Sequence, residues 1–347
     1  MSEALLLDVQ GLRVSLNTPR GPAEALRGVS FQLARGQTLG LIGESGCGKS
    51  ITALALMGLL PDGARVQGSV RLDGRELLGQ PEDAWCALRG NRLAMVFQEP
   101  MTALNPLHPV GRQIAESLRL HKGLDARAAR AEALRLLQRV QLPQAERRLD
   151  AYPHQLSGGQ RQRVVIAIAL ACGPDLLIAD EPTTALDVTI QREVLDLIGQ
   201  LVAEDGMALL LISHDLGVMA ENVQRMLVMY GGSVVERDPT DAVFAHLAHP
   251  YTRGLFAARP RLGMRAEGAA LAGRAEGAGL AGRRGHRLAT IPGRVPELID
   301  LPTGCAFADR CTLAIDACRS AAPPELAVGD GHSARCIRLA EAQGIPA

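Results

Sequence analysis

A glycine-rich segment that follows a short apolar run constrains this 347-residue chain more than any other feature. Its spacing is G-x-x-x-x-G-K-S/T, and its residues are Gly43, Glu44, Ser45, Gly46, Cys47, Gly48, Lys49 and Ser50. Residues 39–42 before it are typical of a strand buried on both faces, and the apolar residues after Ser50 predict a buried helix that ends near Gly58. A strand, a glycine-rich turn and a helix in this order predict a loop whose backbone N–H groups cradle phosphates.

The last two residues of this segment carry its chemistry. In such a loop Lys49 contacts the β- and γ-phosphates of a nucleotide, and the Ser50 hydroxyl is a ligand for Mg²⁺. Lys49 is one of only two lysines among the 37 basic residues of the chain. Because nearly every other basic position is arginine, a compact ammonium at this position supports the phosphate-binding interpretation.

A second acidic element lies where a phosphate-binding site needs one. Residues 176–179 form an apolar run that ends in Asp180 and Glu181. Two neighbouring carboxylates usually mark a solvated strand end, but a buried strand in a chain with a complete phosphate-binding loop changes that interpretation. We expect Asp180 to hold Mg²⁺ through water and Glu181 to polarise an attacking water molecule.

A further helix start follows Leu156. Ser157 is suited to cap the helix, and the helix is expected to run through Ile166 and Leu170. The glycines of this start expose backbone N–H groups, so it predicts a second anion-binding helix terminus. Its residues are Ser157, Gly158, Gly159 and Gln160.

The remaining patterns predict an α/β fold. Apolar strand signals at residues 176–179 and 208–212 alternate with helical stretches, which predicts a parallel sheet with helices on both faces. Residues 4–9 and 12–16 have strand-like patterns and precede a turn cluster at residues 17–22. The apolar spacing over residues 112–140 predicts a mainly helical insert.

Composition excludes several classes of function. The chain has 37 basic and 37 acidic residues, and this balance gives no reason to expect a nucleic-acid partner. Its longest apolar run, residues 164–172, is far shorter than the ~20 residues of a membrane-spanning helix. The first residues lack the pattern of a signal peptide, so we expect a cytoplasmic chain.

These motifs together resemble those of the ABC ATPases. Residues 156–160 read LSGGQ, the signature of that family, and three further elements occur in the family's order: Gln98, the D-loop residues 185–187 and His214. The resemblance implies that Gln98 senses Mg²⁺ and the γ-phosphate, that Asp187 belongs to the nucleotide site, and that His214 acts with Glu181 in hydrolysis. It also implies a P-loop NTPase cassette with a RecA-like parallel-sheet core, an antiparallel β subdomain and a helical subdomain at about residues 96–163.

A wider resemblance narrows the family. Residues 96–106, 152–163, 178–188 and 249–252 are similar to the ATP-binding subunits of oligopeptide and dipeptide uptake ABC transporters, which also include nickel importers. This resemblance implies an ATPase that powers solute import from the cytoplasmic face of the inner membrane. Its implied partners are two membrane permease subunits, a sister ATPase or a second copy of the chain and, indirectly, an extracytoplasmic solute-binding protein. In this family the signature of one subunit covers ATP on the P-loop of another, so the resemblance also implies a dimer.

Two other functions stay open at this point. A soluble ABC ATPase of DNA repair or translation is one, although the short separation of residues 50 and 157 leaves no room for long coiled-coil arms and the chain has one cassette. An importer of nickel or another small solute is the other. One position departs from the family pattern, because Leu16 stands where an aromatic residue usually stacks on adenine.

Residues 241–347 are expected to form an extension to an ATPase domain of residues 1–240. Within it, residues 266–274 and 275–283 are a near-duplicate pair inside a flexible Ala/Gly/Arg insertion at residues 261–287. Four of the seven cysteines follow, with spacing C-x5-C-x6-C-x17-C, which is wide for zinc but suits an iron–sulfur cluster. The resemblance implies a [4Fe–4S] cluster, with zinc or free thiols as alternatives. These four are Cys305, Cys311, Cys318 and Cys336.

Four residues complete the expectations for thiol and imidazole groups. The side chains of Cys47, Cys86 and Cys172 are expected to be plain packing groups. His332 lies among the C-terminal cysteines, and it is either a substitute ligand or a surface side chain.

Overall fold

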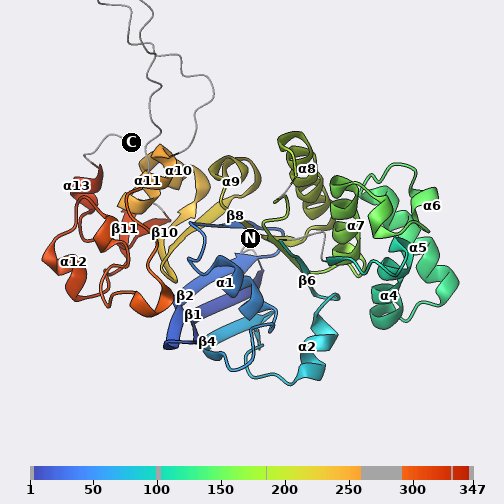
Figure 1. Ribbon diagram of the computed structural model, residues 1–347, viewed down its shortest axis with the longest axis horizontal. Helices are drawn as coiled ribbons and strands as arrows, with labels where there is room; N and C mark the ends of the chain where they lie inside the picture. The colour runs from blue at the N-terminus through green and yellow to red at the C-terminus, as the bar shows by residue number, and fades with distance from the viewer. Residues whose placement is uncertain (1–3, 99–102, 185, 259–290, 330, 344–347) are drawn as a thin grey trace, which may run out of the picture.

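The computed structural model describes residues 4–98, 103–184, 186–258, 291–329 and 331–343, and it is elongated (Figure 1). A large sheet occupies the middle of the molecule. A helical region lies at one end, and the C-terminal residues form the other end (Figure 1). The predicted insertion at residues 261–287 lies outside the described residues.

The large sheet has eight strands within the described residues, in the order β11-β12-β10-β9-β3-β8-β7-β6. The run from β9 to β6 is parallel, as predicted, whereas β10, β12 and β11 pair antiparallel. Its strands are β3 (Thr38–Ile42), β6 (Leu93–Val96), β7 (Leu176–Asp180), β8 (Ala208–Ser213), β9 (Arg225–Tyr230), β10 (Ser233–Pro239), β11 (Leu326–Gly329) and β12 (His332–Ala334).

Each central strand serves two hydrophobic cores at once. On β8, Leu209 and Leu211 belong to one core, and Leu210 and Ile212 belong to the other. All four are at most 2% exposed, so a strand buried on both faces reads as a continuous apolar run. The first core packs against α7, α8 and α9. The second packs against α1 and a second sheet rather than against helices alone, which corrects the expectation of helices on both faces.

The second sheet is antiparallel, in the order β2-β1-β4-β5. The two strands predicted at residues 4–9 and 12–16 are one strand, which shifts register between Val9 and Leu12. Gly11 lies in that shift with φ 57°, a conformation that glycine adopts without strain. The predicted turn cluster closes the β1–β2 hairpin. The bounds are β1 (Leu5–Thr18), β2 (Gly21–Ala34), β4 (Arg65–Leu72) and β5 (Arg75–Glu76).

The helical region confirms the prediction for residues 112–140. Ile114 and Leu118 are buried on α4, and Leu136 and Leu137 are buried on α5, so the apolar spacing marks the packed faces. The helices of the cassette and of this region are α1 (Lys49–Leu56), α2 (Glu82–Leu88), α4 (Val110–Lys122), α5 (Ala126–Arg139), α6 (Ala145–Arg148), α7 (Gly158–Leu170), α8 (Val188–Asp205) and α9 (Leu216–Asn222).

The C-terminal residues join the large sheet through β12, which pairs with β10. Beside this pairing, Glu236 is 1% exposed and accepts hydrogen bonds from the backbone N–H groups of Ala248 and His249. His332 Nε2 lies 2.8 Å from the Glu236 carboxylate and is also buried, so the expectation of a surface side chain is wrong. The helices here are α10 (Thr240–His246), α11 (Pro250–Ala257), α12 (Asp316–Ser320) and α13 (Leu339–Gln343).

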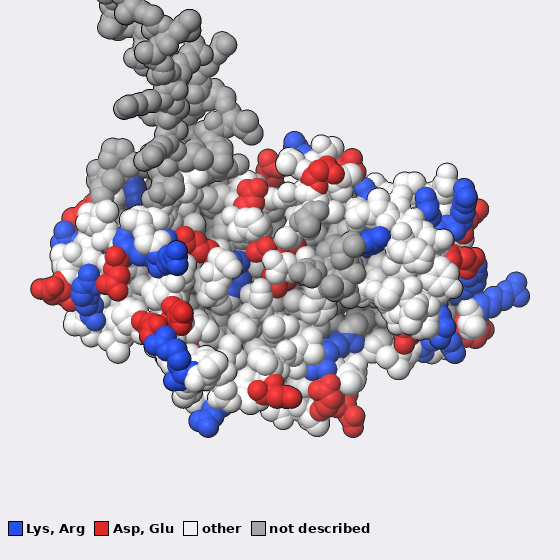
Figure 2. Space-filling model, viewed as in Figure 1, with Lys and Arg blue, Asp and Glu red and all other residues white. Residues whose placement is uncertain are grey.

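Two surface properties complete the fold. The face shown in Figure 2 carries basic and acidic side chains intermixed, as the equal numbers of each would give. In the described part of the chain, no helix combines the length and the apolar character that a membrane span requires.

The cysteines outside the C-terminal cluster differ in burial. Cys172 is buried as expected, but Cys86 is exposed and its Sγ lies 3.6 Å from Glu82 Oε1, so it is not a packing residue.

Candidate nucleotide site

The phosphate-binding loop connects β3 to α1, as the sequence predicts. Gly48 has φ 105°, and a Cβ there would lie 2.8 Å from Leu26 Cδ2, so only glycine fits. Lys49 is 6% exposed, and its Nζ donates to the carbonyl oxygens of Gly43 at 2.8 Å and Glu44 at 3.1 Å. The ammonium is therefore held inside the loop in this conformation.

The loop presents one face to solvent and one to the core. Ser45, Gly46 and Ser50 are exposed. Cys47 lies on the opposite side with 0% exposure, and burial raises the pKa of its thiol. A Cβ on Gly43 would lie 2.3 Å from the Met229 carbonyl oxygen, which shows how closely the loop packs on β9. Only the backbone of Cys47 is placed to serve a phosphate.

Asp180 and Ser50 form a site that suits a divalent cation. Asp180 is the last residue of β7 and is 4% exposed, and burial raises the pKa of its carboxyl group, while a side-chain hydrogen bond with Ser50 opposes that rise. Its Oδ1 has no hydrogen-bond partner. A buried carboxylate oxygen without a partner is costly. A hydrated Mg²⁺ would satisfy it, since carboxylate and hydroxyl oxygens are ligands that Mg²⁺ prefers.

The Glu181 carboxylate is contacted by the other residues predicted to act in hydrolysis. Its Oε2 accepts hydrogen bonds from Gln98 Nε2 at 3.1 Å and Thr184 Oγ1 at 3.1 Å, and it lies 3.3 Å from His214 Nδ1. Glu181 also has φ 45°, a strained conformation for a residue with a side chain, which is common at functional sites. Sequence analysis missed Thr184, although it lies only three residues from Glu181.

The signature residues form a self-contained helix start. Ser157 Oγ accepts from the Gln160 N–H, and Gln160 Oε1 accepts from the Ser157 N–H, a reciprocal cap of α7. Asp187 caps α8 by accepting from the Ile190 N–H at 3.1 Å. A Cβ on Gly159 would lie 2.7 Å from Ile190 Cγ2, so the two helix starts are packed together. Ala185 of the D-loop lies outside the described residues.

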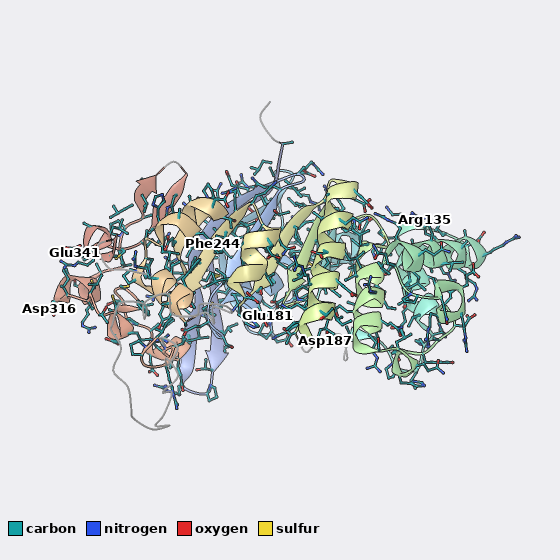
Figure 3. The ribbon with its side chains drawn as sticks, turned by 90° about the horizontal axis from the view of Figure 1, so that it is seen from above. Arg135, Glu181, Asp187, Phe244, Asp316 and Glu341 are labelled. Carbon is teal, nitrogen blue, oxygen red and sulfur yellow. The ribbon has the colours of Figure 1, made fainter. Side chains whose placement is uncertain are left out.

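These residues form two groups on one chain. We call residues 43–50, 98, 180, 181 and 214 the P-loop half and residues 157–160 and 187 the signature half. Helices α1 and α7, which follow the phosphate-binding loop and Ser157, lie apart in Figure 1. Seen from above, the labelled Glu181 and Asp187 lie along the same edge of the molecule (Figure 3).

The four C-terminal cysteines are brought together. They line one cavity of about 20 Å³, together with His249. Burial raises the pKa of the Cys305 and Cys311 thiols and raises that of Cys336 to about 11. Among the described residues, however, no group of three or more His, Cys, Asp and Glu side chains is arranged to hold a metal ion. The structure therefore confirms the gathering of thiols and not a preformed metal site.

Comparison with known proteins agrees with this architecture. Residues 26–184 match the ABC transporter family, and residues 235–282 and 280–318 match the C-terminal region of oligopeptide/dipeptide transporters. The ATP-binding cassette MJ0796, solved as a dimer bound to ADP and Pi, is 27% identical with a TM-score of 0.61 and covers 68% of this chain and 99% of its own. The fold and the two half-sites define an ABC-type ATPase.

The curated relatives are more specific. A peptide import ATP-binding protein of Brucella abortus (strain 2308) is 48% identical over 98% of this chain and 99% of its own. The oligopeptide transport ATP-binding protein OppD of Salmonella typhimurium is 45% identical over 97% of this chain and 95% of its own. The chain belongs to the family of ATP-binding subunits of peptide-transporting ABC systems.

Proposed function

We propose that this chain is the ATP-hydrolysing motor that powers import of peptides or related small solutes through a membrane ABC transporter. The observation that carries the proposal is the convergence of Gln98, Thr184 and His214 on one oxygen of Glu181, beside the P-loop. Relatives that share 45–48% of residues over nearly the whole chain are named for peptide transport, which supports the choice of solute class.

We infer roles for the residues of the P-loop half from the contacts described above. The N–H groups of the loop and of the start of α1 bind the phosphates, and Lys49 turns from its carbonyl partners toward them. Ser50 and Asp180, with Gln98 nearby, would hold Mg²⁺, which when bound would supply charge neutralisation at the phosphates. Glu181 holds the attacking water in line, and His214 fixes the orientation of that carboxylate. Positioning and charge neutralisation supply most of the rate.

The signature half acts on the nucleotide of a second ATPase. Ser157 and Gly158 are exposed, and the N–H groups at the start of α7 suit a γ-phosphate. Two copies of the chain, or this chain with a sister ATPase, would each cover the other's P-loop half with a signature half. The dimeric arrangement of the similar cassette MJ0796 supports this assembly. Turnover then requires a dimer, whereas nucleotide binding does not.

We place the contact with the permease subunits on the helical region. A groove of about 680 Å³ runs along α4 and is lined by His108, Arg112 and Leu120, among others. Leu107 at its margin is 79% exposed and Leu120 is 75% exposed, so apolar surface is available to a partner helix. This arrangement places the chain peripherally at the cytoplasmic face of the inner membrane, with the solute-binding protein on the other side.

For the four cysteines we propose a [4Fe–4S] cluster, and no step of hydrolysis passes through it. Four thiols around one cavity are the donor set that such a cluster uses, and backbone N–H groups reach three of them, as with Arg338 N and Cys336 Sγ at 3.3 Å. Iron, sulfide and visible charge-transfer absorption in an anaerobic preparation would support the cluster. Stoichiometric zinc, or thiols that are fully titratable with no metal, would replace it.

The test of the proposed function is an affinity purification in mild detergent. The Glu181→Gln variant is loaded with Mg²⁺ and ATP, and the associated proteins are identified by mass spectrometry. A Lys49→Ala variant, which lacks the phosphate-binding ammonium, is the matched control. Two multi-span permeases and a second ATPase, retained with Glu181→Gln, support the importer. A soluble homodimer alone, or ribosomal or DNA-repair proteins, would point instead to a soluble ABC ATPase.

A further inference from the structure

The side chain of Glu44, inside the phosphate-binding loop, is held by a residue 266 positions away. Arg310 Nη1 donates to Glu44 Oε2 at 2.5 Å, and Nη2 donates to Oε1 at 3.1 Å. Both carboxylate oxygens are therefore engaged by one planar guanidinium, the geometry in which arginine binds carboxylates best. The Arg310 side chain is 6% exposed and the Glu44 side chain is 27% exposed, so the guanidinium is buried and the pair is partly shielded from solvent.

The Arg310 guanidinium is itself fixed in place. Its Nε donates to the carbonyl oxygen of Pro292 at 2.8 Å, and Nη1 also donates to the Tyr230 hydroxyl at 3.2 Å. The guanidinium carbon lies 5.7 Å from the centre of the Tyr230 ring and 5.9 Å from that of Phe307. An arginine with this many partners has little freedom to follow a carboxylate, so Glu44 is held to a fixed position.

A second contact from the same part of the chain holds the backbone of Glu44. The Glu44 N–H donates to the Tyr251 hydroxyl at 2.7 Å, and Tyr251 on α11 is 0% exposed. The loop is thus held at one residue by two side chains that lie beyond residue 240. Arg310 directly precedes Cys311, which lines the cysteine cavity, so the residue that holds Glu44 is adjacent in sequence to that cavity.

The charge of Glu44 explains why such a hold matters. Lys49 Nζ lies 3.1 Å from the carbonyl oxygen of Glu44. The Lys49 ammonium therefore contacts the same residue that carries the Glu44 carboxylate. A free carboxylate there would compete with phosphate for Lys49 and would repel the negatively charged nucleotide. Arg310 neutralises the carboxylate and occupies both of its oxygens.

We propose that Arg310 is a positioning residue of the nucleotide site, which keeps the Glu44 carboxylate away from Lys49 and the phosphates, with Tyr251 fixing the backbone of the same residue. The C-terminal extension is then a working part of ATP binding. This inference rests on the proposed use of the P-loop to bind Mg²⁺ and ATP.

The inference predicts the direction in which ATP affinity changes in each variant, and the experiment measures that direction. Affinity for Mg²⁺ and ATP is measured by titration calorimetry in the Glu181→Gln background, which prevents turnover. Adding Arg310→Gln leaves the Glu44 carboxylate unpaired, and we expect binding to weaken about tenfold, the size of a lost charge-assisted hydrogen bond. Adding Glu44→Gln as well removes the competing charge, so we expect most of the affinity to return.

Matched variants distinguish a positioning role of Arg310 from a general effect on folding. Arg319→Gln removes an arginine of the same extension that pairs with the exposed Asp309, and it should leave affinity unchanged. Arg310→Lys keeps the charge but not the two-point contact, so its affinity should fall between the parent and Arg310→Gln. Thermal unfolding of each variant shows whether the fold persists. If Arg310→Gln unfolds, Arg310→Lys and Tyr251→Phe carry the same comparison.

The outcomes are distinct. Recovery of affinity in the double variant supports the inference. Unchanged affinity in Arg310→Gln, or a loss that Glu44→Gln deepens rather than reverses, would overturn it. If the parent with intact Arg310 fails to bind ATP at all, the proposed function fails and not this inference alone.

Discussion

The P-loop half and the signature half of the nucleotide site differ in where their polar groups find partners. In the P-loop half, Lys49 is bonded to carbonyl oxygens of the loop itself, Glu44 is bonded to Arg310 of the C-terminal extension, and Glu181 is bonded to Gln98. In the signature half, the Ser157 and Gln160 side chains each accept a hydrogen bond from the other residue's backbone N–H, and Ser157 and Asp187 are exposed. The P-loop half is held in place by other parts of its own chain, whereas the signature half is an exposed helix start.

This difference separates binding from turnover. A half fixed by its own chain can bind a nucleotide alone, since positioning is already in place before the ligand arrives. A half that ends in an exposed helix start acts only when another molecule brings a phosphate to it. Variants in the two halves should therefore fail in different assays, and the following variants test that division in order of expected effect.

The largest effect is expected at Glu181. Glu181→Gln removes the group that activates water, and we expect ATP hydrolysis to fall about 10²- to 10⁴-fold while ATP binding persists. Phosphate release and calorimetric titration measure the two properties separately. The exposed Glu221→Gln, on α9, serves as control. Unchanged turnover in Glu181→Gln would remove Glu181 as the catalytic residue.

A smaller effect, confined to turnover, is expected in the signature half. Ser157→Asp keeps a good helix cap, so stability should hold, but it aims a carboxylate at the partner's phosphates. We expect hydrolysis to fall at least tenfold through charge repulsion, with ATP binding by the single chain unchanged. Ser157→Asn caps equally well without the charge and should keep most of its turnover. Full activity in Ser157→Asp would show that this helix start does not meet a nucleotide.

A third prediction concerns the stability at acidic pH of the C-terminal extension, which supports the P-loop half. Burial lowers the pKa of His249 to about 4, so the unfolded chain binds a proton between pH 6.5 and 4 that the folded chain does not. Folding stability should therefore decline as the pH falls below 6.5, by about 2 kcal/mol at pH 5. Urea unfolding at pH 7 and pH 5 measures the loss.

Histidine 249 also caps α11, which dictates the control variant. His249 Nδ1 accepts from the Tyr251 N–H at 3.0 Å, and asparagine is an equally good cap that does not titrate. His249→Asn should keep its stability between pH 7 and pH 5. If the variant loses as much stability on acidification as the parent, another group is responsible.

The smallest effect is expected at Leu16. Leu16 on β1 is half-buried, and the resemblance to the ABC ATPases implies an aromatic ring at this position. Leu16→Tyr should tighten ATP binding about two- to tenfold through stacking on adenine. Binding of inorganic triphosphate, which has no base, should not change. Equal ATP affinity in both proteins would mean that adenine is held elsewhere.

Local motifs predicted the parts of the site that depend on consecutive residues. The phosphate loop, the carboxylates at the end of β7 and the helix start at Ser157 each need only a short pattern, because backbone geometry supplies the chemistry. The grouping of Gln98 and His214 with Glu181 came from resemblance to the ABC ATPases. The sequence offers no spacing rule that joins three separate strand ends.

The long-range contacts could not be predicted in this way. Arg310 and Glu44 meet across 266 positions, and an arginine in a cysteine-rich segment gives no local sign of its partner. The same holds for His332, which looks like a surface residue until Glu236 is placed beside it in the core. Long-range polar contacts of this kind depend on tertiary packing, and single-sequence patterns report mainly helix and strand periodicity.

The pairing of β12 with β10 has a practical consequence for anyone who shortens this protein. Stopping the chain at the end of α11 would strip β10 of one of its two neighbours, β12, and leave free N–H and C=O groups along that edge of the sheet. Such an edge recruits strands from other molecules, so the trimmed product would tend to aggregate even though every catalytic motif is intact. The residues that follow α11 therefore also protect solubility, independently of any cofactor they hold.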